Sequence, residues 1–342
     1  MPILLPVKAP LGATPPPPVS RRVQPIHLQH TWIDYQGREW DLCSGASGVV
    51  LMAGVRGMTL PPTAEYETES ASEDGAEFLG FRTLKRPVFW PAKVFTADKA
   101  EWYAHDAAWW DTLHPDRSGQ WRVTNPVDGT ARRVVLRCNN DGDMAFDTDP
   151  GLTGWAHYNI YLSTLRSPFW LGALQARSFI ATAKVPFKGG PGGTGKAPSF
   201  WISKANNQAS ASIDNPGTED ASLVYVLDGP QDAGATVGIG ADTTTYNAAI
   251  ADGKSVIIDT RVGRVDARLV DTPDPDLYPP RTEEWFARIE QLWEAGATVF
   301  SNTYPIAYAA DVDPGDSQPI SISFTGSGAT HIALQPCYRR AW

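Results

Sequence analysis

The sequence predicts a mainly β protein, and three observations carry that prediction. Short apolar runs alternate with polar residues, as half-buried strands do, and turn dipeptides such as Asp128-Gly129 and Asp252-Gly253 separate them. Helical periodicity is confined to one segment in each half of the chain. The length of 342 residues suits two domains, and a hydrophobic content of 42% supplies enough core for both.

Residues 1–22 are predicted to be a proline-rich arm. Pro15–Pro18 form a polyproline run, and Ser20-Arg21-Arg22 follows it. Prolines have no N–H to pair in a sheet, and the segment carries too little apolar surface for a core. A disordered tail and an arm lying on a neighbouring subunit both remain open.

Residues 23–170 are predicted to form an N-terminal domain of strands with one helix, a barrel or split barrel. Gln36-Gly37 turns a first hairpin, and Asp128-Gly129 turns another. We expect the helix at about 97–113, capped by Thr96 or Asp98 and stopped by His114-Pro115. One apolar face of that helix carries Trp102, Tyr103, Trp109, Trp110 and Leu113. Asp106 lies on the same face and is the exception.

Residues 171–342 are predicted to form a β-sandwich or barrel. Short β-type runs follow one another with turn signals such as Asn215-Pro216-Gly217 and Asp228-Gly229-Pro230 between them. An amphipathic helix is expected at 283–293. The glycine- and proline-rich stretch 188–198 is expected to be a long loop near the domain junction.

Composition narrows the function classes. The net charge of −9 disfavours a nucleic-acid-binding surface, which would normally be basic. Cys43, Cys138 and Cys337 are few and widely spaced, which indicates thiols rather than a disulfide framework or a zinc site. The first eight residues are too short and too broken by proline for a signal peptide, and no apolar run reaches the length of a membrane helix. We therefore expect synthesis and folding in a cytoplasm, without membrane insertion.

Candidate chemical motifs each fail a requirement of their chemistry. The P-loop-like run Gly190–Ala197 has alanine where a hydroxyl should bind Mg²⁺, and a strand rather than a helix is expected after it. Gly45-Ala46-Ser47-Gly48 lacks the spacing of a serine-hydrolase turn, and the histidines form no zinc motif. Glu65, Glu67 and Glu69 alternate on one strand and are read as a solvated face. A weak cation site remains open at Asp141, Asp143, Asp147 and Asp149. We predict no catalytic, cofactor-binding or metal-binding residues and no enzyme activity.

An ordered set of residues resembles the distal tail proteins of long-tailed siphophages. In the first half it comprises Tyr35–Trp40, Gly54–Gly57, Pro61, Glu67, Asp74-Gly75, Arg86–Val88, Glu101-Trp102, Asp128-Gly129, Arg137 and Ser167–Trp170. In the second half it comprises Ile213–Gly217, Asp228–Pro230, Asp252-Gly253, Val256–Asp259 and Glu294–Gly296. The arm 1–22 and the loop 188–198 depart from that pattern.

The resemblance implies a structural part of a phage tail tip. It implies an N-terminal domain that forms a hexameric ring, a C-terminal galectin-like sandwich, and a place in the virion as the hub that joins the tail tube to the host-adhesion apparatus. The implied partners are copies of this chain, the tail tube protein, a fibre, spike or tail-lysin protein, and the tape-measure protein. The resemblance implies no cofactor and no catalysis.

A ring interface favours aromatic anchors and arginines. The subunit-interface candidates are Trp90, Trp102, Trp109, Trp110, Trp121, Arg82 and Arg86. Two other functions stay open at this point. The 13 tryptophans could form platforms for glycans on a β-sandwich, and the paired carboxylates could serve a hydrolase.

Overall fold

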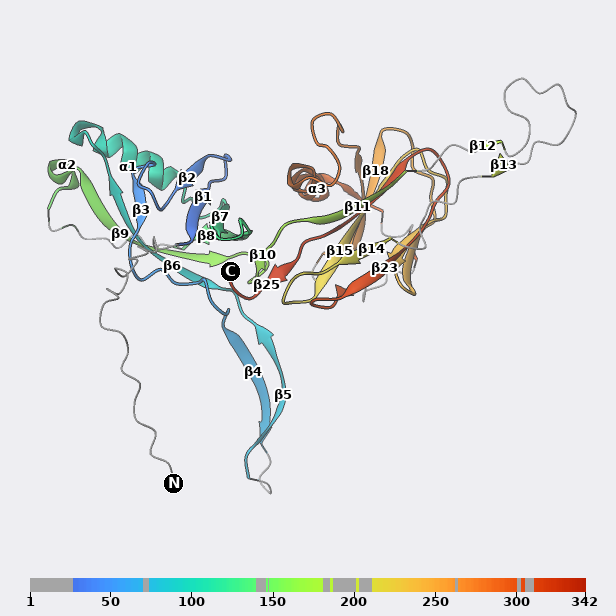
Figure 1. Cartoon of the computed structure of the whole chain (residues 1–342), viewed down its shortest axis with the longest axis horizontal. Helices are drawn as coiled ribbons and strands as arrows, with labels where there is room; N and C mark the ends of the chain where they lie inside the picture. Colours follow the sequence, from blue (N-terminus) through green and yellow to red (C-terminus); the bar gives the residue numbers. More distant parts are fainter. Residues whose placement is uncertain are drawn as a thin grey trace, which may run out of the picture.

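The computed structural model describes residues 27–69, 74–139, 146, 148–180, 211–261, 264–299 and 311–342, and the backbone of three short strands at 185–186, 201–202 and 303–304. The described residues form two lobes, and a two-stranded hairpin projects from the first (Figure 1). The mainly β fold class predicted from the sequence is confirmed.

A nine-stranded antiparallel sheet forms the first lobe. Its main path runs β2-β1-β7-β8-β9-β6-β3, and β10 and β25 attach beside β8. The strands are β1 Gln29–Ile33, β2 Glu39–Asp41, β3 Val49–Leu51, β6 Pro87–Phe95, β7 Gly119–Thr124, β8 Ala131–Cys138, β9 Trp155–Thr164, β10 Trp170–Leu171 and β25 Cys337–Tyr338. The two ends of the path meet where the Leu51 N–H donates to the Leu42 carbonyl at 2.9 Å. The sheet therefore curls into a nearly closed barrel.

Tryptophans fill the interior of this sheet. Alternate residues of each strand face inward, and Trp32, Trp90, Trp121 and Trp170 are at most 1% exposed. Neighbouring indoles meet at angles rather than face to face, with ring centroids 5.3 Å apart for Trp32 and Trp90 and 5.2 Å apart for Trp90 and Trp121. Gly119 makes room for Trp32, because a Cβ there would lie 2.3 Å from the indole.

Helices close one face of the first lobe. A 3-10 turn, η1 (Lys99–Glu101), leads into α1 (Trp102–Asp111), and a short α2 (Pro150–Thr153) lies beside them. The predicted helix is confirmed, with Asp98 accepting a bond from the Ala100 N–H at its start. Tyr103 departs from the prediction because it is exposed and donates to Asp149 Oδ1 at 2.8 Å. Asp106 is tolerated on the inner side because the Tyr158 hydroxyl donates to it at 2.6 Å.

Two facing sheets form the second lobe, as the sequence predicts. The larger runs β11-β24-β15-β18-β19-β20, with β22 beside β15, and the smaller runs β14-β23-β16-β17-β21. The larger sheet contains β11 Gln175–Ile180, β15 Ala221–Asp228, β18 Lys254–Asp259, β19 Asp266–Asp271, β20 Ala297–Thr298, β22 Asp311–Val312 and β24 Ala329–Leu334. The smaller contains β14 Ser212–Asp214, β16 Ala235–Ile239, β17 Asp242–Tyr246, β21 Thr303–Tyr304 and β23 Ser317–Ser323, and β12 Val185–Pro186 pairs separately with β13 Trp201–Ile202.

Apolar clusters lie on both sides of the larger sheet. Between the two sheets the buried residues include Tyr225, Val237, Ile258 and Ile332. On the outer side, α3 (Glu283–Ala295) packs through a buried face of Trp285, Phe286, Ile289 and Trp293. The helix predicted at 283–293 is therefore confirmed.

The end of the described chain returns to the first lobe. β25 pairs with β10, and Ala341 is buried in the tryptophan cluster of the first lobe. Ion pairs also join the lobes: Arg133 to Glu283 at 2.6 Å, Arg166 to Glu294 at 2.8 Å, and Arg339 to Glu219. The predicted domain limits, 1–22, 23–170 and 171–342, stay predictions.

Candidate assembly surfaces

The structure places most of the predicted interface residues inside the first lobe. Trp90, Trp102, Trp109 and Trp121 are buried, and Trp110 is partly buried against Tyr158 at a centroid distance of 5.1 Å. These tryptophans therefore pack within the single chain. Their place at a subunit interface stays a prediction.

Of the two arginine candidates, one is exposed and the other is buried. Arg82 is exposed on the projecting hairpin. Arg86 is 1% exposed and forms no ion pair with a carboxylate among the described residues; its guanidinium donates to the carbonyls of Gly57 and Pro168 at 2.9 and 2.7 Å. It also donates to the Thr59 carbonyl and, at 2.8 Å, to the Arg339 carbonyl. Burial lowers the pKa of Arg86 to about 10, which still leaves it charged at neutral pH.

Within the part of the chain that the structure describes, the hairpin formed by β4 (Thr63–Glu69) and β5 (Ala76–Thr83) pairs with no third strand. It projects away from the first lobe, and nearly all of its described side chains are exposed (Figure 1). Sequence reasoning expected only one strand and a loop here. A two-stranded hairpin alone is marginally stable in water, so this one is expected to gain stability from a partner.

A bulge gathers the two phenylalanines of the hairpin on one face. In a regular strand, Phe78 and Phe81 would face opposite sides, because they are three residues apart. The register shift between Tyr66 and Glu67 places Phe81 opposite Glu65 and Phe78 opposite Glu67. Both phenylalanines therefore share a face with the glutamates of β4, and they are more than half exposed. The row Glu65, Glu67 and Glu69 is the acidic border of an apolar face.

A second exposed aromatic surface lies on the outer side of β6 and β9. We call it the β6–β9 strip: Phe89, Pro91, Lys93 and Phe95 face the same side as Tyr161, Asn159, His157 and Trp155. Tyr161 is 51% exposed and Trp155 is 41% exposed. Phe89 and Tyr161 form a ring pair at 5.1 Å. Contiguous apolar surface of this kind is uncommon on a monomer and marks interaction sites.

The strip is bordered by positive charge. The Lys93 ammonium lies 4.9 Å from the centre of the Trp155 ring, and the Arg56 guanidinium lies 5.7 Å from the Phe89 ring. Arg137 is exposed at the edge of the strip, opposite Ser163 in the β8–β9 register. None of these three cations has a carboxylate within ion-pair distance in the described part of the chain.

The other chemical candidates are dispersed or structural. Cys43, Cys138 and Cys337 are thiols that lie buried or half-buried. Gly190–Ala197, Asp141, Asp143 and Asp147 lie outside the described residues, and Asp149 caps α2. Within the described ranges, no group of three or more His, Cys, Asp or Glu side chains is arranged to hold a metal. No helix there is long and apolar enough to cross a membrane.

A hydrogen-bonded chain that the sequence did not indicate crosses the larger sheet. His331 bonds to Ser178 Oγ through Nδ1 at 2.7 Å and to Asp228 Oδ2 through Nε2 at 2.9 Å. Trp285 of α3 packs against the imidazole at 5.4 Å. Ser178 lies on β11, His331 on β24 and Asp228 on β15. These hydrogen bonds therefore connect three neighbouring strands beneath α3.

Comparison with solved structures identifies the fold. The distal tail protein of phage SPP1, described as a paradigm of the hub adsorption apparatus of phages that infect Gram-positive bacteria, aligns with a TM-score of 0.51 and 11% identity. The alignment covers 91% of this chain and 99% of that one. The chain has the fold of a distal tail protein. The resemblance drawn from the ordered residues is thus confirmed.

Further comparisons give more distant or partial matches. A chain of the phage P2 baseplate in its activated, calcium-containing conformation aligns with a TM-score of 0.49 and 10% identity, over 91% of this chain and 98% of that one. In sequence, minor tail protein Gp27 of Mycobacterium phage D29 is 29% identical over 118 residues. That match spans 33% of this chain and only about a third (35%) of the curated relative. No family model matches the chain.

Proposed function

We propose that this chain is a structural component of a siphophage tail tip, located in the virion. It forms a ring with copies of itself, a homohexamer, and serves as the hub that joins the tail tube to the host-adhesion apparatus. Its further neighbours are the tail tube protein, the tape-measure protein and a fibre, spike or tail-lysin protein. The distal tail fold and the phage minor tail relative support this role. Glycan platforms are not favoured, because most of the described tryptophans are enclosed in the two cores.

The main support for self-assembly is the β4–β5 hairpin, which projects from the first lobe. Residues 84–86 link β5 directly to β6, so the hairpin leaves the lobe at the Pro87 end of β6 (Figure 1). Its phenylalanines therefore remain exposed in the single chain. A neighbouring copy is the partner that would cover them.

The β6–β9 strip of that neighbouring copy matches the hairpin in chemistry and length. The hairpin face offers Phe78 and Phe81 bordered by glutamates, and the strip offers aromatic rings bordered by Arg56, Lys93 and Arg137. The seven residues of β4 span about 23 Å and the nine of β6 about 30 Å at ~3.3 Å per residue. Opposite charges at the rim would set register, and the aromatic contact would supply most of the affinity.

The test is the mass of the purified protein in solution. We expect a ring mass by light scattering for the natural chain and a monomer for Phe78→Ser with Phe81→Ser. Leu277→Ser is the matched control: it removes another exposed apolar side chain, on the second lobe, and should leave the ring intact. Circular dichroism confirms that each variant is folded.

Charge reversal tests the docking partner. Glu65→Lys with Glu67→Lys should weaken the ring, and adding Lys93→Glu with Arg137→Glu should restore it in part. A natural chain that stays monomeric at high concentration, or a ring that survives loss of both phenylalanines, would contradict self-assembly through this hairpin. Loss on the first reversal without rescue by the second would keep the hairpin and reject the strip.

A further inference from the structure

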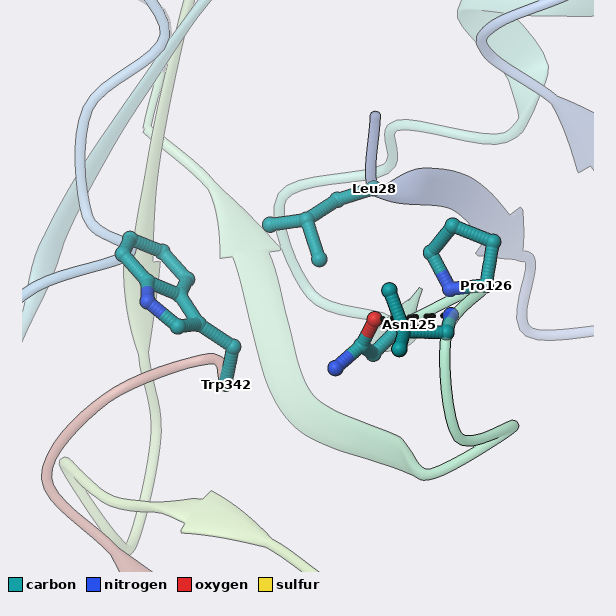
Figure 2. Close-up of a pocket in the computed structure, with 5 residues that line it drawn as sticks. Leu28, Asn125, Pro126 and Trp342 are labelled. Atoms are coloured by element: carbon teal, nitrogen blue, oxygen red, sulfur yellow. Dashed lines mark hydrogen bonds between the residues drawn. The ribbon is translucent and has the colours of Figure 1, made fainter. Parts of the chain in front are cut away.

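An open groove on the first lobe has the chemistry of a polyproline-binding slot. Leu28, Asn125, Pro126, Val127 and Trp342 line a cavity of about 290 Å³ (Figure 2). Its walls are mostly apolar, and the indole of Trp342 stands across from Leu28. Arg340 stacks on the same indole at 4.8 Å, which helps to hold the ring in place.

Asn125 supplies a hydrogen-bond donor to this groove. Its Oδ1 accepts from the Val127 N–H at 3.0 Å, which fixes the amide plane. The Nδ2 group makes no hydrogen bond among the described residues, and Figure 2 shows it directed toward the Trp342 side of the groove. A polyproline segment has carbonyl acceptors and no N–H donors, so it pairs well with a slot that combines an aromatic ring with a free donor.

The chain contains one polyproline run, and it lies close in sequence to the groove. The described chain begins at His27, next to Leu28 in the groove wall, and Pro15–Pro18 precedes it by eight residues. Those eight residues reach about 26 Å when extended at ~3.3 Å each, which is enough to fold back. We propose that Pro15–Pro18 docks in this groove of its own chain.

Because the polyproline run is tethered to the groove by the chain itself, it can occupy the groove even if its affinity is low. A short linker gives an effective concentration of about 1 mM, so a groove with a Kd of about 100 µM would be filled about nine-tenths of the time. Proline runs in general favour an extended conformation in solution, so docking of such a run loses little conformational entropy. The other apolar part of the arm, Ile3–Leu5, is farther in sequence from Leu28 and contains no proline run to preorder it.

Trypsin cleavage at Arg21 and Arg22 of the full chain measures the docking. These arginines follow Pro18 by three and four residues, so a docked arm shields them. We expect cleavage to be about 10-fold faster in Trp342→Ala and in Pro16→Gly with Pro17→Gly, which matches nine-tenths occupancy. Leu277→Ala, an exposed change on the second lobe, should leave the rate unchanged. The proline variant cannot disturb the groove, so it separates docking from misfolding.

Competition identifies the occupant. A synthetic peptide of residues 12–22 should displace the arm and speed cleavage, and the same peptide with glycines at the four prolines should not. The proposal is overturned if the natural chain is cleaved as fast as the proline variant, if a peptide of residues 1–8 competes instead, or if protection depends on protein concentration, which would mean docking on a second copy. Repeating the cleavage in Phe78→Ser with Phe81→Ser, the variant expected to be monomeric, removes ring formation from the measurement, so either proposal can fail alone.

Discussion

At the scale of single residues, the buried Arg86 and the half-buried His30 are the titratable groups that matter most for stability. Arg86 holds four carbonyls from three separate segments: the 57–59 turn, the turn at Pro168 and the returning end of the chain at Arg339. Buried carbonyls are costly when they lose their donors. Arg86 thus fixes the end of the chain on the first lobe.

Replacing Arg86 by lysine should destabilise the protein by about 2–4 kcal/mol, because one ammonium cannot reach carbonyls arranged around a planar guanidinium. Urea unfolding gives this number. Arg82→Lys, on the exposed hairpin, is the control and should change stability by less than about 0.5 kcal/mol. Equal effects of the two changes would argue against the role of Arg86.

His30 should make stability depend on pH. Burial, with a smaller effect of the His27 charge, lowers the pKa of His30 from 6.5 to about 4. The folded state thus favours the neutral ring, so its contribution is complete above pH 6.5 and is lost as pH falls toward 4. The difference in unfolding free energy between the natural chain and His30→Gln should shrink by up to about 3 kcal/mol between pH 7 and 4. A constant difference would contradict this reading.

The burial of individual tryptophans could not be predicted from the sequence. The tryptophans of the first half were predicted at subunit contacts, and the structure encloses Trp90, Trp102, Trp109 and Trp121 within the lobe. An indole suits a core and an interface equally well in composition. Only the packing of the neighbouring strands decides between them.

At the scale of elements, periodicity predicted helices and sandwich strands well. The helix at Glu283–Ala295 was expected from its apolar face, and the strands β15, β18, β23 and β24 from their apolar runs. The β4–β5 hairpin was only half predicted, because its bulge breaks the alternation that signals a strand. β11 and β17, whose sequences are largely polar or mixed, were not predicted.

The start of α3 offers an element-level prediction. Thr282 Oγ1 accepts from the Trp285 N–H at 3.1 Å and caps the helix that covers the outer sheet. Thr282→Ala should cost about 1 kcal/mol of unfolding free energy, and Thr282→Ser should cost little because the cap is kept. Chemical denaturation followed by tryptophan fluorescence measures both. Equal losses in the two variants would show that the hydroxyl is not the stabilising group.

At the scale of the whole molecule, two segments of the chain link the lobes, one between β10 and β11 and one between β24 and β25. The helix α3 also joins them. Glu283 at the start of α3 accepts from Arg133 and from the Leu174 N–H, and Glu294 near its end pairs with Arg166. Arg133 also donates to Gln335, which lies on the segment between β24 and β25. These contacts fix the orientation of the second lobe.

Removing Arg133 and Arg166 together should loosen that orientation. We expect the distance distribution between spin labels at Val127 and Leu277, one on each lobe, to broaden in the double alanine variant and in high salt. Lys254→Ala breaks an ion pair within the second lobe and is the control. An unchanged distribution in the double variant would mean that the two linking segments and the Arg339–Glu219 pair are enough to hold the lobes.

The sequence by itself determined the fold class, the two β-rich halves and both main helices, because these follow from local periodicity and the order of turns. The likeness to distal tail proteins came from an ordered set of residues that resembles that family. The tertiary structure alone decided which aromatic residues are enclosed and which are exposed. It also decided that a bulge gathers Phe78 and Phe81 on one face, and that the end of the chain returns to Arg86. Burial and long-range register depend on contacts between residues far apart in the chain, which no local pattern encodes.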